Sequence, residues 1–135
     1  MGVKDYVRWL GAIYDQTELA PWFLSATCFA YPSAMGVNIL HAFGYGLPVV
    51  TSDDPRLHGP EIAALSSGTN GLLYRRGDAR DLAEKIRCLV ENPDRRELMS
   101  QGALRTVTET YTIENMTTRF AAAIRAASRF AHGAH

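Results

Sequence analysis

The stretch from Tyr31 to Thr51, YPSAMGVNILHAFGYGLPVVT, decides the fold of this chain. An apolar run ends on Pro32 and Ser33, a helical segment follows, and a Gly-Leu-Pro turn leads into a second apolar run. A strand, a tight turn and a helix N-terminus in this order leave several backbone N–H groups unpaired at the positive end of a helix dipole. Such a place suits a phosphate-bearing ligand, and in open α/β folds ligands bind beyond the carboxyl ends of the strands.

Length and composition limit the class of molecule that carries this stretch. The chain has 135 residues, of which 47% are hydrophobic and 21% are charged, as expected for one soluble globular domain with a single core. Lys plus Arg and Asp plus Glu number 14 each, so the formal net charge is zero. The sequence contains no basic tract for nucleic acid or for an anionic membrane, and a general affinity for polyanions is therefore not expected.

Cysteine usage and hydropathy indicate the compartment. Cys28 and Cys88 lie far apart in apolar segments without the spacing of a metal site, which predicts two structural thiols in a reducing cytoplasm. No apolar run approaches the ~20 residues that span a bilayer, and charged residues near the N-terminus argue against a signal peptide. We expect a cytoplasmic protein that is attached to a membrane at most through a surface patch.

Apolar runs alternate with helical patterns along the chain, as in βα units built around a parallel sheet. The predicted strands are 6–10, 28–31, 48–52 and 70–74, and the predicted helices are 17–26, 36–45, a short one from Glu61, 78–92, 95–109 and 112–130. Thr17 is expected to cap its helix, and the wholly apolar run 28–31 is typical of a strand at the centre of a sheet. The sequence thus predicts an α/β fold: a Rossmann-like, three-layer α/β/α domain with about four parallel strands and a helical C-terminal tail, in which residues 132–135 fray.

Polar residues of the helix predicted at 36–45 fall on one stripe. Asn38, His41 and Tyr45 recur at i, i+3 and i+7, while the apolar residues lie on the side that can meet the sheet. The stripe faces either solvent or a ligand, and Ser33 can likewise cap the helix or contact a ligand. Since no G-x-G-x-x-G pattern follows a strand, the fingerprint of a dinucleotide-binding site is absent.

Other ionisable residues fall in turns and loops. Glu61 follows a proline at a predicted helix start, where its carboxylate can favour the positive helix end or contact a ligand. His58 is expected to be an exposed loop residue, although its loop leaves the same strand-end region as the turn at Ser33. The remaining turn residues, Asp53, Asp54, Arg75, Arg76 and Asp78, are predicted to form polar, solvated turns.

Several motifs together resemble those of a known family. The run PSAMGVNILHAFGYGLPVVTSD is followed by HGPEI, by NGLLY, by a helix with DLAEKI and by the segment YTIENM. In this order they resemble the C-terminal half of a GT-B glycosyltransferase. More narrowly, they are similar to the retaining, nucleotide-sugar-dependent transferases that include glycogen synthase and many lipopolysaccharide and capsule enzymes. The resemblance runs from Tyr6 to the last helix and implies that residues 1–131 are part of the C-terminal domain of such an enzyme.

The resemblance also implies where a sugar donor would bind. In the family this half binds a nucleotide sugar, and the helix aligned with residues 36–45 presents its N-terminus to the diphosphate. The donor would be a UDP- or GDP-sugar used as substrate, with no separate cofactor and no metal, and the acceptor would be a glycan or a glycolipid. Carried onto this sequence, the donor-binding residues are Ser33, Ala34, Met35, Gly36, Val37, Asn38, His41 and Glu61.

The sequence departs from the family pattern in two respects. The family's motif has two glutamates separated by seven residues, and the alignment places Ser33 and His41 at these positions. Both side chains can hydrogen-bond hydroxyl groups, but neither supplies a permanent negative charge. In addition, the upstream βα units that hold the diphosphate and the acceptor-binding N-terminal domain have no counterpart in the sequence. We therefore expect the donor-side portion of a larger transferase, with little or no catalysis by this chain alone.

Two other classes of protein are alternatives to a glycosyltransferase. A non-catalytic interaction module that keeps the fold but has lost its donor site is favoured by the absence of both glutamates. A receiver or dinucleotide-binding domain is disfavoured, because the chain opens without the acidic cluster or the glycine fingerprint that either would need. An uncovered sheet edge would drive self-association, so a homodimer is predicted, and the full enzyme would lie at the inner membrane face at most as a peripheral protein.

Overall fold

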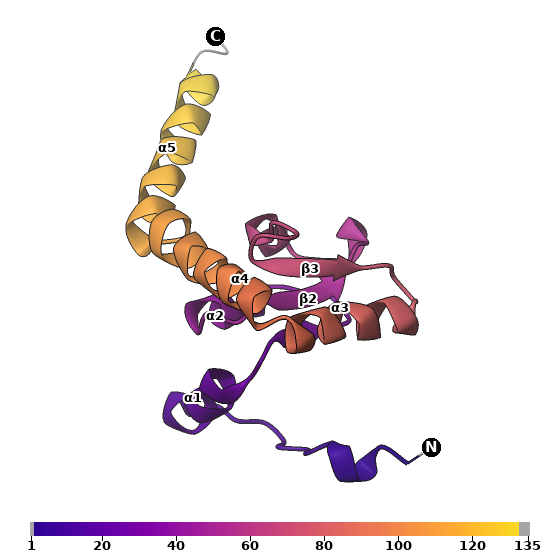
Figure 1. The fold of residues 1–135 in the computed structure, drawn as a ribbon. Helices are drawn as coiled ribbons and strands as arrows, with labels where there is room; N and C mark the ends of the chain where they lie inside the picture. Colours follow the sequence, from indigo (N-terminus) through magenta and orange to yellow (C-terminus); the bar gives the residue numbers. More distant parts are fainter. Residues whose placement is uncertain (1, 133–135) are drawn as a thin grey trace.

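A parallel three-stranded sheet forms the centre of the computed structural model, which describes residues 2–132 (Figure 1). Val50 in the central strand lies opposite Ala30 on one side and Leu72 on the other. The strands are short because each is followed at once by a turn that leads into a helix or a helical turn. Their bounds are β1 (Phe29–Tyr31), β2 (Val49–Ser52) and β3 (Gly71–Tyr74), in the order β1-β2-β3.

Helices cover both faces of this sheet. The α-helices are α1 (Gln16–Ser25), α2 (Asn38–Gly44), α3 (Ala79–Glu91), α4 (Pro93–Arg105) and α5 (Ile113–His132). Shorter helical turns are η1 (Lys4–Tyr6), η2 (Pro55–Leu57), η3 (Pro60–Ala64) and the π-helical turn η4 (Thr106–Thr110) that follows α4. Helix α2 packs on one face and α3 on the other, while α4 contacts both helices, so the body has three layers.

The alternation of side chains along β2 divides the core in two. Val49 points to the α2 side and packs in a cluster with Phe43 and Met35, whereas Val50 points to the α3 side and packs with Leu89. All five of these side chains are at most 1% exposed. Because successive residues of a strand face opposite sides, a strand buried on both faces needs apolar residues on both, and Val49 and Val50 provide them.

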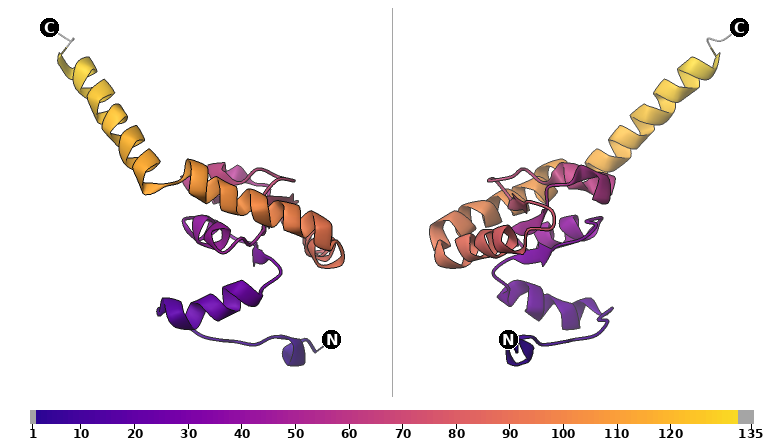
Figure 2. Two further views of the ribbon diagram at one scale, coloured as in Figure 1. Left: turned by 60° about the vertical axis from the view of Figure 1, so that its left-hand side comes forward. Right: turned by 90° about the vertical axis from the view of Figure 1, so that its right-hand side faces the viewer.

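Two parts of the chain lie outside the packed body (Figure 2). Residues 2–15 and α1 run beneath the sheet in a separate layer, which touches the body through Phe23, and α5 extends away from α4. Exposed aromatic and aliphatic side chains are concentrated in these two parts. Within residues 2–132 no helix combines the length and the hydropathy needed to cross a membrane.

The structure confirms the fold class and corrects the number and roles of the strands. Residues 6–10, predicted as a strand, form none: Tyr6 ends a helical turn, and Trp9 is 91% exposed. An isolated extended run of this length gains too little without a hydrogen-bonded neighbour. The predicted central strand, β1, is an edge strand here, because among residues 2–132 it pairs only with β2.

The helices begin and end close to the predicted positions, with two corrections. Helix α1 is capped by Asp15, whose carboxylate accepts from the backbone N–H and the hydroxyl of Thr17, so Thr17 is a partner of the cap and not the cap itself. Helix α2 starts at Asn38, because Gly36 and Val37 belong to the preceding turn. Residues 133–135 of the predicted frayed tail lie outside the described residues.

Candidate functional site

Three loops meet where the parallel strands end. We call residues 32–37, which follow β1, the strand-end turn, and residues 53–59, which follow β2, the acidic loop. The hydroxyl of Tyr74, the last residue of β3, donates to the carbonyl of Pro32 over 2.8 Å. The N–H of Gly59 donates to the carbonyl of Met35 over 2.8 Å. The strand-end turn is thus tied both to β3 and to the acidic loop.

The strand-end turn carries a group of free backbone donors. Asn38 accepts the N–H of Gly36 on its side-chain oxygen over 2.9 Å, which turns the chain into α2. Among residues 2–132 no hydrogen-bond partner occurs for the backbone N–H groups of Ser33, Ala34, Val37 and Asn38. Ser33, Ala34 and Val37 are also exposed. Free donors at the carboxyl end of a parallel sheet, beside a helix start, are an arrangement that can accept an anionic ligand.

Gly36 leaves the approach to these donors open. Its φ is not positive, and a Cβ atom built on it would meet no other atom within 4 Å. The glycine is therefore not required by the conformation of the turn. What its lack of a side chain provides is room for another molecule to come close to the backbone.

His58 is the residue that fixes the strand-end turn to the acidic loop. Its Nδ1 atom lies 3.1 Å from the N atom of Met35, and its Nε2 atom lies 2.9 Å from the carbonyl oxygen of Ser52. The ring is half-buried. The expectation of an exposed loop histidine is wrong, because both ring nitrogens are bonded to backbone groups of other segments.

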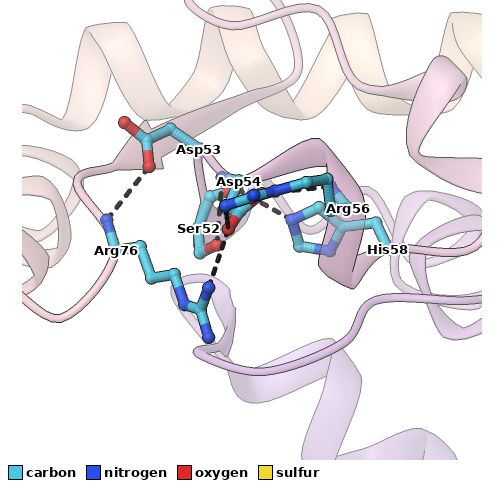
Figure 3. Close-up of polar contacts among 6 residues, drawn as sticks. All are labelled: Ser52, Asp53, Asp54, Arg56, His58 and Arg76. Carbon is cyan, nitrogen blue, oxygen red and sulfur yellow. Dashed lines mark hydrogen bonds and ion pairs between the residues drawn. The ribbon is translucent and has the colours of Figure 1, made fainter.

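Asp54 organises the acidic loop (Figure 3). Arg56 donates its Nε to Oδ1 and its Nη2 to Oδ2, each over 3.0 Å, and Arg76 donates its Nη1 to Oδ2 over 2.8 Å. Hydrogen bonds from the side chain and then the backbone of Arg56 hold the pKa of the Asp54 carboxyl well below its usual range, with a smaller contribution from Arg76 and against the effect of desolvation. Asp54 is 9% exposed, so the prediction of a solvated turn is wrong for this residue.

Asp53 behaves differently from its neighbour. It is exposed, as predicted, and its carboxylate accepts the backbone N–H of Arg76 over 3.0 Å (Figure 3). The two aspartates therefore bind different groups of the same arginine, one its backbone and the other its guanidinium. Arg75 and Asp78 form the predicted polar turn and are joined by an ion pair of 3.6 Å.

The polar stripe on α2 is partly covered. The His41 ring stacks 5.0 Å from Phe23 of α1 and lies 5.4 Å from Tyr45, and its Nε2 is 3.2 Å from the side-chain oxygen of Gln16. Asn38 begins the same helix and bonds back to Gly36. The stripe thus has two parts: Asn38 lies at the strand-end turn, and His41 lies under α1.

The remaining predicted site residues lie close to the turn or form its support. Glu61 folds back over Gly59, where a Cβ atom would lie 2.5 Å from its Oε2 and 3.6 Å from the Cα of Gly36. Met35 is 1% exposed, so it offers only backbone to a ligand and anchors the turn in the core. Ser33 has no side-chain hydrogen bond among residues 2–132, and it does not cap α2, whose N-cap residue is Val37. No group of three or more metal-ligating side chains occurs in the described part of the chain.

The sequence offered little sign of the two supporting residues, His58 and Asp54. Their partners Met35 and Arg76 are more than 20 positions away, at separations of 23 and 22 residues. Only the fold brings these positions together. The one usable signal was that the loop holding both residues leaves the same strand end as the turn at Ser33.

A parallel sheet with helices on both faces places this domain in the broad class of Rossmann-like α/β domains. Residues 1–92 match the family model described as glycosyl transferases group 1. The chain is 34% identical over 106 residues to a D-inositol 3-phosphate glycosyltransferase of Nocardioides sp., covering 76% of this chain and 22% of that protein. It is also 34% identical over 107 residues to the sulfoquinovosyl transferase SQD2 of Arabidopsis thaliana, covering 76% of this chain and 20% of that protein.

Solved structures share the fold at lower identity. The C-terminal domain of a glycosyl transferase group 1 family protein (LpcC) from Francisella tularensis superposes with a TM-score of 0.63 at 21% identity, over 77% of this chain and 53% of that one. Sucrose-phosphate synthase from Thermosynechococcus elongatus gives a TM-score of 0.76 at 22% identity, over 96% of this chain and 32% of that one. The structure of Anabaena HepE in complex with UDP gives a TM-score of 0.65 at 19% identity, over 78% of this chain and 29% of that one.

This chain belongs to the glycosyl transferases group 1 family, and it has the fold of the C-terminal domain of a GT-B glycosyltransferase. It spans less than a quarter of the length of either curated relative, at 22% and 20%. The family resemblance, which was inferred from the run that begins at Pro32 and from the motifs after it, is thereby confirmed.

Proposed function

We propose that this chain is the donor-binding portion of a retaining glycosyltransferase, which moves a hexosyl-type sugar from a nucleotide diphosphate sugar to an acceptor. The observation that carries the proposal is the group of free N–H groups on the strand-end turn, in a chain of this family. The UDP held by a structure of the same fold supports a nucleotide diphosphate sugar as the ligand class, and a UDP- or GDP-sugar is the proposed substrate. No metal or separate cofactor enters the proposal.

The proposed role of the turn is to bind the diphosphate. The N–H groups of Ser33, Ala34, Val37 and Asn38 can donate to phosphate oxygens, and the open space at Gly36 lets those oxygens approach the backbone. Fixed donors of this kind stabilise negative charge that grows on a departing diphosphate, because they need not reorganise during the reaction.

Side chains around the turn would contact the sugar and the nucleoside. The hydroxyl of Ser33 is exposed and free of other partners among residues 2–132, so it can bond a sugar hydroxyl. The carboxylate of Glu61, folded over Gly59, is the acidic group proposed to accept such a hydroxyl. The Nε2 atom of His41 can bond the ligand only by giving up its contact with Gln16, while the ring stacks on Phe23.

Catalysis belongs, in this proposal, to a longer protein. The chain spans a fifth to a quarter of its curated relatives, and we propose that the acceptor, a glycan or glycolipid in polysaccharide biosynthesis, binds to a region outside these residues. Closure of that region over the donor would exclude water from the reacting groups. We propose a cytoplasmic enzyme, peripheral to the inner membrane face at most. The chain alone is expected to bind donor weakly and to transfer little or no sugar.

A second candidate is a non-catalytic interaction module that keeps this fold. The observation that favours it is the chemistry at the two family positions: Ser33 and His41 stand where the family has glutamates, and the His41 ring is occupied by α1. Such a module would not need the free donors of the strand-end turn.

Isothermal titration of the 135-residue chain with UDP, GDP and their sugar conjugates distinguishes the two candidates. We expect binding in the millimolar range or tighter that is lost in Gly36→Val, since the new side chain fills the open approach to the turn. Gly44→Val is the matched control: it is also a non-positive-φ glycine with nothing within 4 Å of a Cβ atom, but it lies at the other end of α2.

His41→Ala measures whether the ring takes part. An unchanged affinity would leave His41 as a packing residue between α1 and α2, and a reduced affinity would support its proposed contact with the donor. The absence of binding by the unmodified chain at millimolar nucleotide would contradict donor binding and favour the interaction module.

A further inference from the structure

We propose that His58 is a positioning residue for nucleotide binding: its neutral ring, as the Nε2–H tautomer, locks the strand-end turn in the shape that exposes the free backbone donors. The inference rests on the proposed function for its consequence in binding, but the lock itself is a property of the ligand-free chain. It assigns a role to a residue that is not among the predicted donor-binding residues.

The hydrogen bonds determine the tautomer. The Met35 N–H can only donate, so the Nδ1 atom, 3.1 Å away, must present a lone pair. The Ser52 carbonyl can only accept, so the Nε2 atom, 2.9 Å away, must carry the proton. One neutral tautomer satisfies both bonds at once, and neither the other tautomer nor the protonated ring can.

The two bonds join the site to the buried central strand of the sheet. Ser52 ends β2, whose four residues are all buried and which is hydrogen-bonded to strands on both sides. Met35 is the only buried residue of the strand-end turn. The planar ring of His58 therefore holds Met35, in the middle of the turn, at a fixed distance from the end of the central strand.

The geometry of the turn depends on two anchors. Pro32, at its start, is held by the hydroxyl of Tyr74, and Met35 is held by His58 and by the N–H of Gly59. Ser33 and Ala34, with their free N–H groups, span the interval between the anchors. Val37 and Asn38, the other free donors, follow Met35 after Gly36, so the direction in which they point depends on the position of Met35.

Loss of the His58 ring should loosen the turn between Pro32 and Met35 but leave the domain folded. The pairing of β1 with β2 is made by backbone bonds between residues 29–31 and 49–51, and the core cluster around Phe43 does not include His58. The start of the turn would still be held by Tyr74. We therefore expect a change in binding that exceeds the change in stability.

The variants His58→Leu and His58→Asn separate positioning from packing. Leucine keeps most of the ring volume and removes both bonds. Asparagine places its side-chain oxygen where Nδ1 stands, so it keeps an acceptor for Met35, but its amide group is too short to reach Ser52. Should His58→Leu not fold, the truncation His58→Ala takes its place, because it introduces no new atoms.

The experiment measures the chain with and without ligand. Nitrogen-15 NMR of the histidine rings in the ligand-free chain is expected to find His58 as the Nε2–H tautomer. Titration with UDP and GDP is expected to show about fivefold to tenfold weaker binding by His58→Leu, as for one lost hydrogen bond, and recovery of part of the affinity by His58→Asn, which keeps the acceptor for Met35. Thermal melts should remain close to that of the unmodified chain for both.

Three results would overturn the assignment: an Nδ1–H or protonated ring in the ligand-free chain, unchanged affinity in a folded His58→Leu, or no recovery in His58→Asn. If the unmodified chain binds neither nucleotide, the proposed function itself fails, and with it the role of His58 in binding. Failure of the proposed function can be told apart from failure of the His58 assignment, because the tautomer of His58 is measured in the ligand-free chain.

Discussion

Two apolar runs of this chain differ in burial: one lies in the core and the other is exposed to solvent. Val49 and Val50 of β2 are 0% exposed, whereas Tyr6 and Trp9 of the N-terminal segment are 90% and 91% exposed. Both runs are rich in residues that favour strands. The difference is that β2 has hydrogen-bonded neighbours on both sides and helices on both faces, while the N-terminal segment has no strand beside it among residues 2–132. Residues that favour strands form one only where neighbouring strands supply hydrogen bonds and helices cover the faces.

The helices show the same difference between buried and exposed apolar side chains. Helix α3 packs Leu89 against the sheet. Helix α5 extends away from the body (Figure 1) and leaves Ile113 80% and Phe120 70% exposed. A phenylalanine of α2, Phe43, is 0% exposed. The chain therefore has a complete core of modest size and, at both ends of the sequence, apolar surface that the described residues do not cover.

The largest expected effect is on the core itself. Phe43→Ala should destabilise the domain by about 3–5 kcal/mol, because a buried ring is lost and a cavity is left. The matched variant Phe120→Ala, at an exposed position of α5, should change stability by less than about 0.5 kcal/mol. Urea unfolding followed by circular dichroism measures both. Equal effects of the two variants would mean that α5 is packed in solution as tightly as α2.

A second test concerns the close contact between α4 and the loop before β3. A Cβ atom on Gly102 would collide with the backbone carbonyl of Thr69, which cannot move as a side chain could. Gly102→Ala should therefore cost about 1–3 kcal/mol despite the better helix propensity of alanine. Gly44→Ala, where nothing lies within 4 Å, is the control and should be neutral or slightly stabilising. A stabilised Gly102→Ala would show that α4 does not approach the loop this closely.

Asp54 provides a smaller, pH-dependent test of the body. Hydrogen bonds from Arg56 lower its pKa in the folded chain, so its contribution to stability is present above the unfolded carboxyl pKa of about 4 and is lost as the pH falls through the lower folded value. Asp54→Asn should lower the Tm at neutral pH by a few degrees, and the difference from the unmodified chain should shrink in strong acid.

Thermal melts from neutral to strongly acid pH check this expectation. Asp53→Asn is the control, because Asp53 is exposed and accepts only a backbone N–H. A Tm difference between Asp54→Asn and the unmodified chain that persists unchanged into strong acid would contradict an ionised Asp54 as its source.

The sequence was most informative where a residue's role depends on its near neighbours. The strands at 48–52 and 70–74 and the helix opened by Asp78 were predicted to within a residue or two. The turn from Ser33 to Asn38 was identified from its strand, turn and helix order alone. In each case, local patterning and turn chemistry agree with the fold.

It failed where a role depends on distant partners. The run 6–10 has the composition of a strand, but the strand it needs beside it is not among residues 2–132. His58 and Asp54 looked like loop residues because their partners, Met35 and Arg76, come next to them only in the folded chain. The missing glutamates at Ser33 and His41 were visible in sequence, but the covering of His41 by Phe23 was not.

The smallest expected effect arises at the free edge of β1. The N–H of Phe29 donates to the carbonyl of Pro48, and because successive N–H groups of a strand alternate in direction, the N–H of Ala30 points to the free edge. We predict weak self-association at this edge, whose neighbouring hollow of about 890 Å³ is lined by residues such as Trp9 and Tyr31. Three residues offer few bonds, so a dimer should be detectable only at high concentration.

Ala30→Pro tests that prediction with little change to the monomer. Proline removes the one N–H that faces outward and is tolerated at the edge of a sheet, so the pairing of β1 with β2 through Phe29 should survive. Light scattering across a concentration series should show the unmodified chain rising above the monomer mass and Ala30→Pro staying at it. Ala30→Ser, which keeps the N–H, should behave as the unmodified chain does. A monomeric mass for the unmodified chain and both variants would mean that an open edge of three residues is too short for pairing. The strands β1 and β2 would then differ in their burial but not in their tendency to pair with a further strand.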